Sequence, residues 1–508
     1  FLDVLDDDLN SISYLASISG LSHEFEIARD GISLEIGGFS DKLEILLETL
    51  VDRLVKFSDP SLEDIMWNET RRARFHVLRE KLLKNLKNFG YTVPYNQVGP
   101  MISSLINENS WLVDDQLEIY SAVTFENLRS YVSSLFSTCF VETLVVGNYD
   151  KKSAKDLSRM VSSKLQKSVS LSRSQYTRGR SLNLPDGKAF HYLKENDDPE
   201  NVNSCIEVYI QLGMISDAPN RVMAELIAQI LHEPFFDRLR TKEQLGYVVF
   251  SGIRETRTTF GLRFLIQSER PTGYLYMRIK QFIAKESRKL ALLSEEDFKK
   301  HVNALIVKKL QKVKNISEER SRFWNRIASG FYDFERREED SNLLRTIPLK
   351  AVQEYFEDKI VNLDHHGELI VHLQGHATAN NATSYQNLVS NFIYQKPELD
   401  DVEYDQDALN ALVQEVSKKK VDSDDFVDSL INHHTFKSIV PKFSFSSELK
   451  RYLRDEIAKN YAKIPYDDQN IFIRQVGEWK SSIPLTAAPS AKIMDCYLDK
   501  SNALDSKF

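Results

Sequence analysis

Two side chains near the middle of this 508-residue chain are suited to stabilising negative charge on a carbonyl oxygen. Arg240 and Tyr247 both donate hydrogen bonds, and arginine stays charged at any working pH. In a closed site, such donors can hold a peptide carbonyl and the oxyanion that forms when the carbonyl is attacked. An exposed arginine beside a half-buried tyrosine also fits a purely structural role, so residue chemistry alone leaves both interpretations open.

The predicted secondary structure places this pair at a helix-to-strand turn. A helix that starts near Asn220 meets Pro234, which should kink or end it because proline lacks the N–H that the helix needs. A charged segment follows, and a strand begins near Leu245. Arg240 and Tyr247 therefore flank the turn.

Metal-ligating spacing is missing from the sequence. A zinc peptidase needs two histidines and a glutamate on one helical face, as in His-x-x-Glu-His. Among the eleven histidines, the nearest match is His23-Glu-Phe-Glu, where Ile27 occupies the place of the second histidine in a strand-like stretch. A Gly-x-Ser-x-Gly elbow and a Gly-x-x-x-x-Gly-Lys phosphate loop are also missing. We therefore expect this chain to bind no metal itself.

An internal repeat indicates how these residues are positioned. The chain contains two copies of the same series of elements, about 230 residues apart. Each copy consists of a strand, an amphipathic helix and a basic helix, and is followed by a further strand. The first copy comprises Gly31–Phe39, a helix from Leu43, a helix capped by Asp59-Pro60, and Glu142–Gly147. The second comprises Gly261–Gln267, a helix from Leu275, a helix capped at Ser294, and Glu368–Leu373. The repeat predicts an α+β fold of two homologous domains, each a mainly antiparallel sheet with helices packed on one face.

Composition shifts give the domain boundaries. The polar stretch 170–188 lacks periodicity and is typical of a linker. We predict a first domain at 1–175, truncated at its N-terminus, and a second at 184–375 plus 470–495. Residues 376–469 form a charged insertion or extension with an acidic run at 398–407. Such runs are usually solvated loops or helices, and a regulatory or partner-binding insertion is the alternative.

The overall composition narrows the class of protein. Hydrophobic residues are 42% and no apolar run reaches about 18 residues, so we expect no membrane insertion. The net charge of −8, without a basic patch, predicts no nucleic-acid partner. Three widely spaced cysteines fit a reducing compartment, and we expect a cytoplasmic protein. Leu2, Leu5, Leu9 and Ile12 place the first residues inside an amphipathic helix, which is typical of a fragment.

One segment resembles a known protein family. The stretch Phe236-Asp-Arg-Leu-Arg-Thr-Lys-Glu-Gln-Leu-Gly-Tyr-Val-Val-Phe-Ser-Gly252 is similar to the hallmark stretch in the C-terminal half of insulin-degrading enzymes of the pitrilysin (M16) family. Gly261–Pro271 continues this similarity, and Glu478–Leu485 resembles the closing segment of the family. The resemblance covers residues 1–375 and 470–490.

The resemblance implies a fold, a reaction and site residues. Family members have four homologous domains in two halves that close around a peptide, and the N-terminal half binds zinc through the inverted histidine motif. The C-terminal half supplies an arginine and a tyrosine near the scissile bond, which correspond to Arg240 and Tyr247. An aromatic residue four positions before the arginine lines the pocket past the scissile bond and corresponds to Phe236.

The resemblance thus implies the C-terminal half of a zinc-dependent peptide endopeptidase. This chain would be inactive alone, with a peptide as substrate and the N-terminal, zinc-binding half of the same protein as partner. The long segment 376–470 is similar to that of a fungal branch whose yeast members trim a peptide pheromone precursor. The alternative is a non-catalytic scaffold or interaction subunit of the same family. The presence of both Arg240 and Tyr247 favours the enzyme, because a scaffold has no use for the pair.

Overall fold

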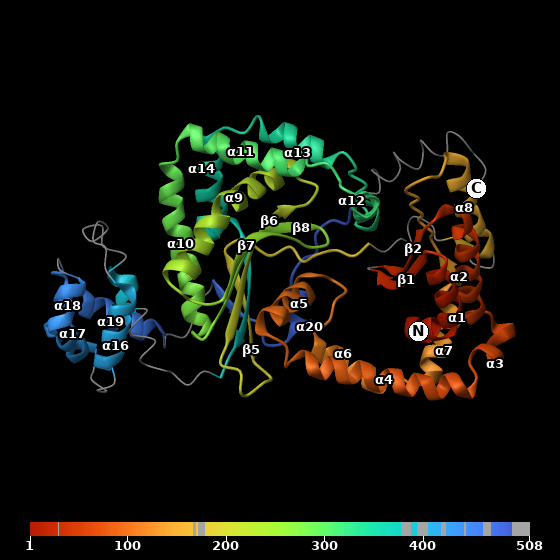
Figure 1. The fold of residues 1–508 in the computed structure, drawn as a ribbon, viewed down its shortest axis with the longest axis horizontal. Helices are drawn as coiled ribbons and strands as arrows, with labels where there is room; N and C mark the ends of the chain where they lie inside the picture. The colour runs from red at the N-terminus through yellow and green to blue at the C-terminus, as the bar shows by residue number, and fades with distance from the viewer. Residues whose placement is uncertain are drawn as a thin grey trace.

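The computed structural model describes residues 1–28, 30–165, 169–170, 178–376, 388–393, 405–417, 423–440, 443–460 and 469–489. These residues form an N-terminal group of helices with a short hairpin, a central unit built on a large sheet, and a small helical bundle (Figure 1). Part of the predicted linker, residues 171–177, and most of the acidic run, within residues 394–404, lie outside the described residues.

The N-terminal group packs amphipathic helices against a two-stranded sheet. Its elements are α1 (Leu2–Ile18), β1 (Leu21–Ala28), β2 (Gly31–Gly38), α2 (Leu43–Phe57), α3 (Glu63–Met66), α4 (Glu69–Phe89), α7 (Phe125–Leu135), β3 (Thr138–Cys139), α8 (Lys151–Lys164) and β4 (Val169–Ser170). Leu5 and Leu9 of α1 are buried against Leu50 and Phe57 of α2 in one core. The helix at the start of the chain, the strand at 31–39 and the helix from Leu43 are therefore confirmed.

One prediction for this group was wrong. The helix expected after Asp59-Pro60 is divided, and α4 begins separately after Asn68, whose side-chain oxygen accepts a hydrogen bond from the Arg71 backbone N–H at 3.1 Å. The strand predicted at Glu142–Gly147 stays a prediction. β3, which precedes it, pairs in parallel with β4, and residues 171–177, which follow β4, lie outside the described residues.

The central unit is built on a six-stranded mixed sheet in the order β10-β5-β9-β6-β8-β7. The strands are β5 (Lys188–Glu195), β6 (Ser204–Met214), β7 (Val248–Glu255), β8 (Thr259–Ser268), β9 (Gly367–Gln374) and β10 (Asn470–Phe472). β5 pairs in parallel with both β9 and β10, and the other three pairings are antiparallel. The α+β class with a mainly antiparallel sheet is confirmed.

One face of this sheet is covered by long helices. They are α9 (Ala218–Phe236), α10 (Thr272–Ala291), α11 (Glu295–Lys309), α13 (Arg336–Leu344) and α14 (Leu349–Phe356), with α12 (Ile316–Ala328) between α11 and α13 in the sequence. Ile206, Val208 and Ile210 of β6 all point into this core. They recur every second residue, which is the period of one strand face.

The opposite face is also covered, and partly by the N-terminal segment. α5 (Pro94–Ile106) and α20 (Val476–Ser482) lie across the sheet from α9 and α10, and α6 (Val113–Ala122) follows α5 (Figure 1). Cys205 and Tyr209 of β6 share a core there with Ile102 and Leu105 of α5. The sheet is therefore buried on both sides, and residues of the segment 1–175 complete its core.

The described part of the segment 376–469 is a helical bundle with a core of its own. It contains α16 (Gln406–Ser417), α17 (Ser423–Asn432), α18 (His434–Ile439) and α19 (Ser446–Asn460), together with residues 388–393. Leu409, Phe426, Phe436 and Leu449 are buried in its interior. This part of the charged segment is thus a packed unit rather than a solvated loop.

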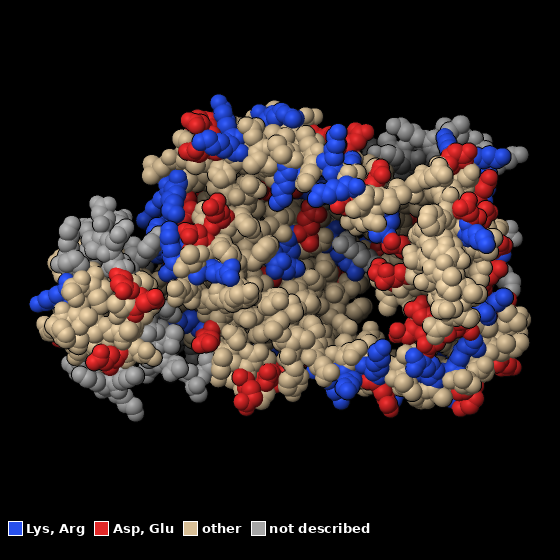
Figure 2. Space-filling view, viewed as in Figure 1, with Lys and Arg blue, Asp and Glu red and all other residues tan. Residues whose placement is uncertain are grey.

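Charged side chains of both signs are interspersed on the face shown in Figure 2. Around α4 this reflects ion pairs between helices: Arg72 pairs with Glu126 of α7 and Arg74 pairs with Asp7 of α1. None of the described helices is long and apolar enough to cross a membrane.

The packing of α5 on the sheet predicts a large effect of one core substitution. Ile102 is completely buried, so Ile102→Ala should lower the free energy of unfolding by about 2–5 kcal/mol, from lost transfer energy and the cavity left behind. Ile119→Ala is the matched control, since Ile119 is 51% exposed on α6 and should cost less than about 0.5 kcal/mol. Urea denaturation of both variants measures the difference, and equal effects would show that α5 does not pack tightly.

Candidate active site

The three predicted site residues lie together in the structure. Phe236 ends α9, Arg240 lies in the following π-helical segment η4 (Asp237–Lys242), and Tyr247 directly precedes β7. The guanidinium carbon of Arg240 lies 4.7 Å from the centroid of the Phe236 ring and 5.0 Å from that of the Tyr247 ring. The cation therefore contacts both aromatic rings, and these contacts orient its donor groups.

The polar ends of this cluster remain available to a ligand. Tyr247 is 82% exposed and Phe236 is 37% exposed. Within the described part of the chain, neither the Arg240 guanidinium nor the Tyr247 hydroxyl forms a hydrogen bond or an ion pair with another residue. Two side-chain donors thus lie side by side with an aromatic surface next to them, which suits a carbonyl oxygen or a developing oxyanion.

The helix that carries Phe236 does not end at its proline. α9 continues through Pro234 to Phe236, and the chain then widens into the π-helical segment η4. Proline removes one N–H from the helix ladder, but the remaining contacts hold the helix here. The prediction that Pro234 kinks or ends the helix misplaced the end of α9 by two residues and missed the π-helical segment. This segment carries Arg240, and wide turns of this type occur frequently at functional sites.

A buried ion network stabilises the position of η4. Glu243, the residue after η4, is fully buried and accepts hydrogen bonds from Arg238 and Arg278. The Arg278 Nε–Glu243 Oε2 distance is 3.0 Å. Burial by itself would lower the pKa of Arg278, but the Glu243 carboxylate outweighs it and raises this pKa above its usual value. Because Arg278 belongs to α10, the network ties η4 to the helical layer.

The turn into β7 is held by close backbone contacts. Leu245 is buried, and its N–H donates to the Leu239 carbonyl at 3.0 Å. Gln244 has φ of +47°, a region that non-glycine residues rarely adopt. A Cβ at Gly246 would lie 1.8 Å from the Gln267 carbonyl oxygen of β8. The turn therefore needs a glycine at 246, and this close contact fixes the position of the next residue, Tyr247.

The sequence indicated the candidate site residues but not the residues that support them. Glu243 appears in the sequence as one charge in a charged run, and nothing in its spacing connects it to Arg278, which is 35 residues away. Gly246 carried a clearer signal, since a glycine within a predicted strand often marks a close backbone approach.

The cluster itself does not suit a metal ion. Its polar groups are a guanidinium and a phenol, and a permanent cation repels a second one. No group of three or more His, Cys, Asp or Glu side chains that could bind a metal occurs among the described residues.

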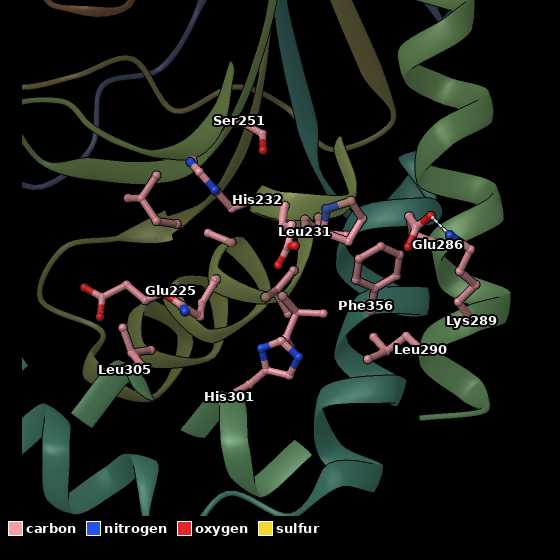
Figure 3. Close-up of a pocket in the computed structure, with 18 of the residues that line it drawn as sticks. Glu225, Leu231, His232, Ser251, Glu286, Lys289, Leu290, His301, Leu305 and Phe356 are labelled. Carbon is pink, nitrogen blue, oxygen red and sulfur yellow. Dashed lines mark hydrogen bonds and ion pairs between the residues drawn. The ribbon is translucent and has the colours of Figure 1, made fainter. Parts of the chain in front are cut away.

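A cavity of about 1180 Å³ lies next to the cluster. It is lined by α9, β7, α10 and α11, including His232, Ser251, Glu286 and His301 (Figure 3). Asp237 and Lys242 connect it with η4, but Arg240 and Tyr247 do not line it. The donors and the cavity are therefore neighbouring features.

Comparison with known proteins places the chain in a family. Residues 1–119 match the model for the middle or third domain of peptidase M16, and residues 226–324 match that for the PQQ synthase PqqF-like C-terminal lobe domain 4. The chain is 34% identical to the A-factor-processing enzyme of Saccharomyces cerevisiae over 374 residues, which are 74% of this chain and 35% of that protein. It is 33% identical to the insulin-degrading enzyme of Homo sapiens over 364 residues, 71% of this chain and 34% of that protein. The chain belongs to the M16 peptidase family.

The M16 assignment agrees with the fold. The crystal structure of pitrilysin superposes with a TM-score of 0.69 at 16% sequence identity, over 96% of this chain and 41% of that one. The chain spans about a third of the length of the two curated relatives. The second family match, residues 226–324, contains Phe236, Arg240 and Tyr247.

Two substitutions test the architecture of the site. Gly246→Ala should lower the free energy of unfolding by about 1–3 kcal/mol, because its Cβ must push β8 away. Gly31→Ala is the control, since a Cβ there meets no atom within 4 Å, and its effect should stay within about 0.5 kcal/mol. Thermal unfolding distinguishes them, and an unchanged Gly246→Ala protein would rule out the close approach.

The buried ion network predicts a larger loss. Glu243→Gln removes the carboxylate that pairs with the buried Arg278 guanidinium and should cost about 3–5 kcal/mol. The control is Glu296→Gln, whose carboxylate is exposed and 3.1 Å from Lys300, and which should cost less than about 1 kcal/mol. Chemical denaturation measures both, and similar values would show that Glu243 is not essential to the fold.

Proposed function

We propose that this chain is the C-terminal half of a zinc-dependent peptide endopeptidase of the insulin-degrading-enzyme type. It would comprise the third and fourth family-type domains, at 1–175 and at 184–375 plus 470–495. The observation that carries the proposal is the Arg240 guanidinium in contact with both the Phe236 and the Tyr247 rings, 4.7 and 5.0 Å from their centroids. The family models matched at 1–119 and 226–324 support this division.

In this proposal the side chains of the chain bind and orient the peptide. Arg240 and Tyr247 donate hydrogen bonds to the carbonyl oxygen of the scissile bond, and these bonds strengthen as negative charge develops on that oxygen. Phe236 offers an apolar surface to the side chain that follows the scissile bond. Zinc, bound by the N-terminal half of the same protein, would supply the activated water.

The relatives indicate the substrate class. One relative is named for processing A-factor and another for degrading insulin. We infer that this protein acts on peptides too, in pheromone maturation or in peptide degradation. The three widely spaced cysteines support a cytoplasmic location.

The donor pair predicts the effect of two substitutions on catalysis. In the full-length protein, Tyr247→Phe and Arg240→Ala should each lower kcat by about 10²–10³-fold, because each removes a donor to the oxyanion. The control is Tyr131→Phe, which alters an exposed tyrosine on α7 and should leave kcat unchanged. Steady-state cleavage of a fluorogenic peptide gives these values, and wild-type turnover in both site variants would disprove the role.

A second experiment separates the enzyme from a non-catalytic family member. Peptide cleavage is measured with this chain alone and with the full-length protein, with zinc and then with a chelator. We expect cleavage only by the full-length protein and its loss on chelation. If neither form cleaves any peptide, the chain belongs instead to a scaffold or interaction subunit.

A further inference from the structure

Two histidines on neighbouring strands form a hydrogen-bonded pair in the interior. His191 of β5 and His372 of β9 are almost completely buried, and His191 Nδ1 lies 3.0 Å from His372 Nε2. Both rings lie under Tyr276 of α10, whose ring centroid is 5.3 Å from that of His191 and 6.3 Å from that of His372. The pair is therefore near the edge of the sheet opposite to β7 and the candidate active site.

The hydrogen bonds determine where each ring carries its proton. Asn470 Oδ1 of β10 lies 2.9 Å from His191 Nε2 and can only accept, so His191 is protonated at Nε2. A neutral His191 then accepts at Nδ1, and His372 donates from Nε2. His372 Nδ1 is left without a proton, and it has no hydrogen-bond partner in the described structure. The arrangement is complete only while both imidazoles are neutral.

The pair also holds β10 on the sheet. β10 is an edge strand of three residues, and within the described part of the chain it pairs only with β5. Two backbone hydrogen bonds of 2.8 Å, donated by the Ala189 and Ile473 N–H groups, join the two strands. The side chains add the His191–Asn470 hydrogen bond and the Phe472 ring, which is stacked on His191 with the centroids 5.3 Å apart. Since a strand this short has few backbone bonds, its pairing depends on these side-chain contacts.

The charged groups described beside the pair are engaged with one another. Glu368 of β9 is fully buried, and its carboxylate pairs with Lys280 of α10 and lies 2.9 Å from His366 Nε2. The same carboxylate accepts a hydrogen bond from the Tyr276 hydroxyl at 3.2 Å. On the other side of β9, β6 supplies an apolar neighbour, Ile206. A proton added to the histidine pair would therefore place a new positive charge in the core, where the nearby carboxylate is already occupied.

We propose that the His191–His372 pair is an acid-sensitive latch, which releases β10 from β5 as the pH falls below about 6.5. In the closed form, a second proton on His191 would point two donors at each other, and one on His372 would leave a buried charge without an acceptor. In the open form, with β10 detached, water reaches both rings and they protonate freely. This inference goes beyond the proposed function and does not depend on it.

The sign of the pH dependence follows from the difference between the two forms. Burial, together with the charge that His191 would carry, lowers the pKa of His372 well below its ordinary value. The closed form is therefore fully favoured above about pH 6.5, and this advantage is lost progressively as the pH falls. Between about pH 7.5 and 5.5, each histidine that opening exposes should raise the opening equilibrium constant about 10-fold, and two should raise it about 100-fold.

Hydrogen exchange of the full-length protein measures this opening. Mass spectrometry of peptic peptides follows the Ala189 and Ile473 amides, which join β5 and β10, with correction for the intrinsic effect of pH on exchange. Their protection should fall about 100-fold from pH 7.5 to 5.5, while the amides that pair β6 with β8 stay protected. Unchanged protection between β5 and β10 would overturn the latch. An equal fall between β6 and β8 would also overturn it, because the whole sheet would then be unfolding.

Two substitutions distinguish the histidine pair from other sources of pH dependence. His372→Phe removes one titrating ring and should reduce the fall in protection to about 10-fold. Asn470→Asp places a carboxylate 2.9 Å from His191 Nε2, so the closed form keeps one proton and the fall should again be about 10-fold. His76→Gln is the control: it alters an exposed histidine on α4 and should keep the 100-fold fall. A 100-fold fall that persists in either site variant would show that other groups control the opening.

Discussion

The Glu243 carboxylate is buried between the guanidinium groups of Arg238 and Arg278, and the geometry of the candidate site depends on this contact. Charges removed from water are stable only while each keeps its partner. η4 therefore cannot move away from α10 without leaving an unpaired charge in the interior. Arg240 lies between Arg238 and Glu243 in the sequence, so its position follows from that of its neighbours.

The exposed part of the site is held by weaker and more local contacts. The two aromatic rings on either side of Arg240 restrict the guanidinium without taking up its hydrogen bonds. Beneath them, the close approach of Gly246 to Gln267 fixes the start of β7. The buried ion network thus holds the backbone of the site in place, while the Arg240 and Tyr247 donors stay available to a ligand. Catalysis requires such donors to bind the transition state more tightly than the substrate.

The sheet under the site is constrained on both faces. Side chains of β6 alternate between the core under α9 and the core under α5, so a shift of this strand by one residue would disrupt both cores. Because α5 comes from the segment 1–175, this segment and the central sheet share one core at this interface.

Much of the fold could be predicted because hydrophobic periodicity reflects local geometry. The strand at Gly261–Gln267 and the cap at Ser294 each gave the correct element, since each is decided within a few residues. The strand predicted at Glu142–Gly147 stays a prediction, because residues 171–177, which follow β4, lie outside the described structure. Strand formation depends on a distant segment, which a local pattern does not reveal.

The same division applies to the site. The sequence by itself determined the candidate site residues, because Phe236, Arg240 and Tyr247 belong to one recognisable segment and their chemistry is intrinsic. Only the tertiary structure decided how they are held. The Glu243–Arg278 contact and the approach of Gly246 to β8 join separate segments of the chain. Burial and strand order, which create these contacts, are properties of the folded chain and not of any single segment.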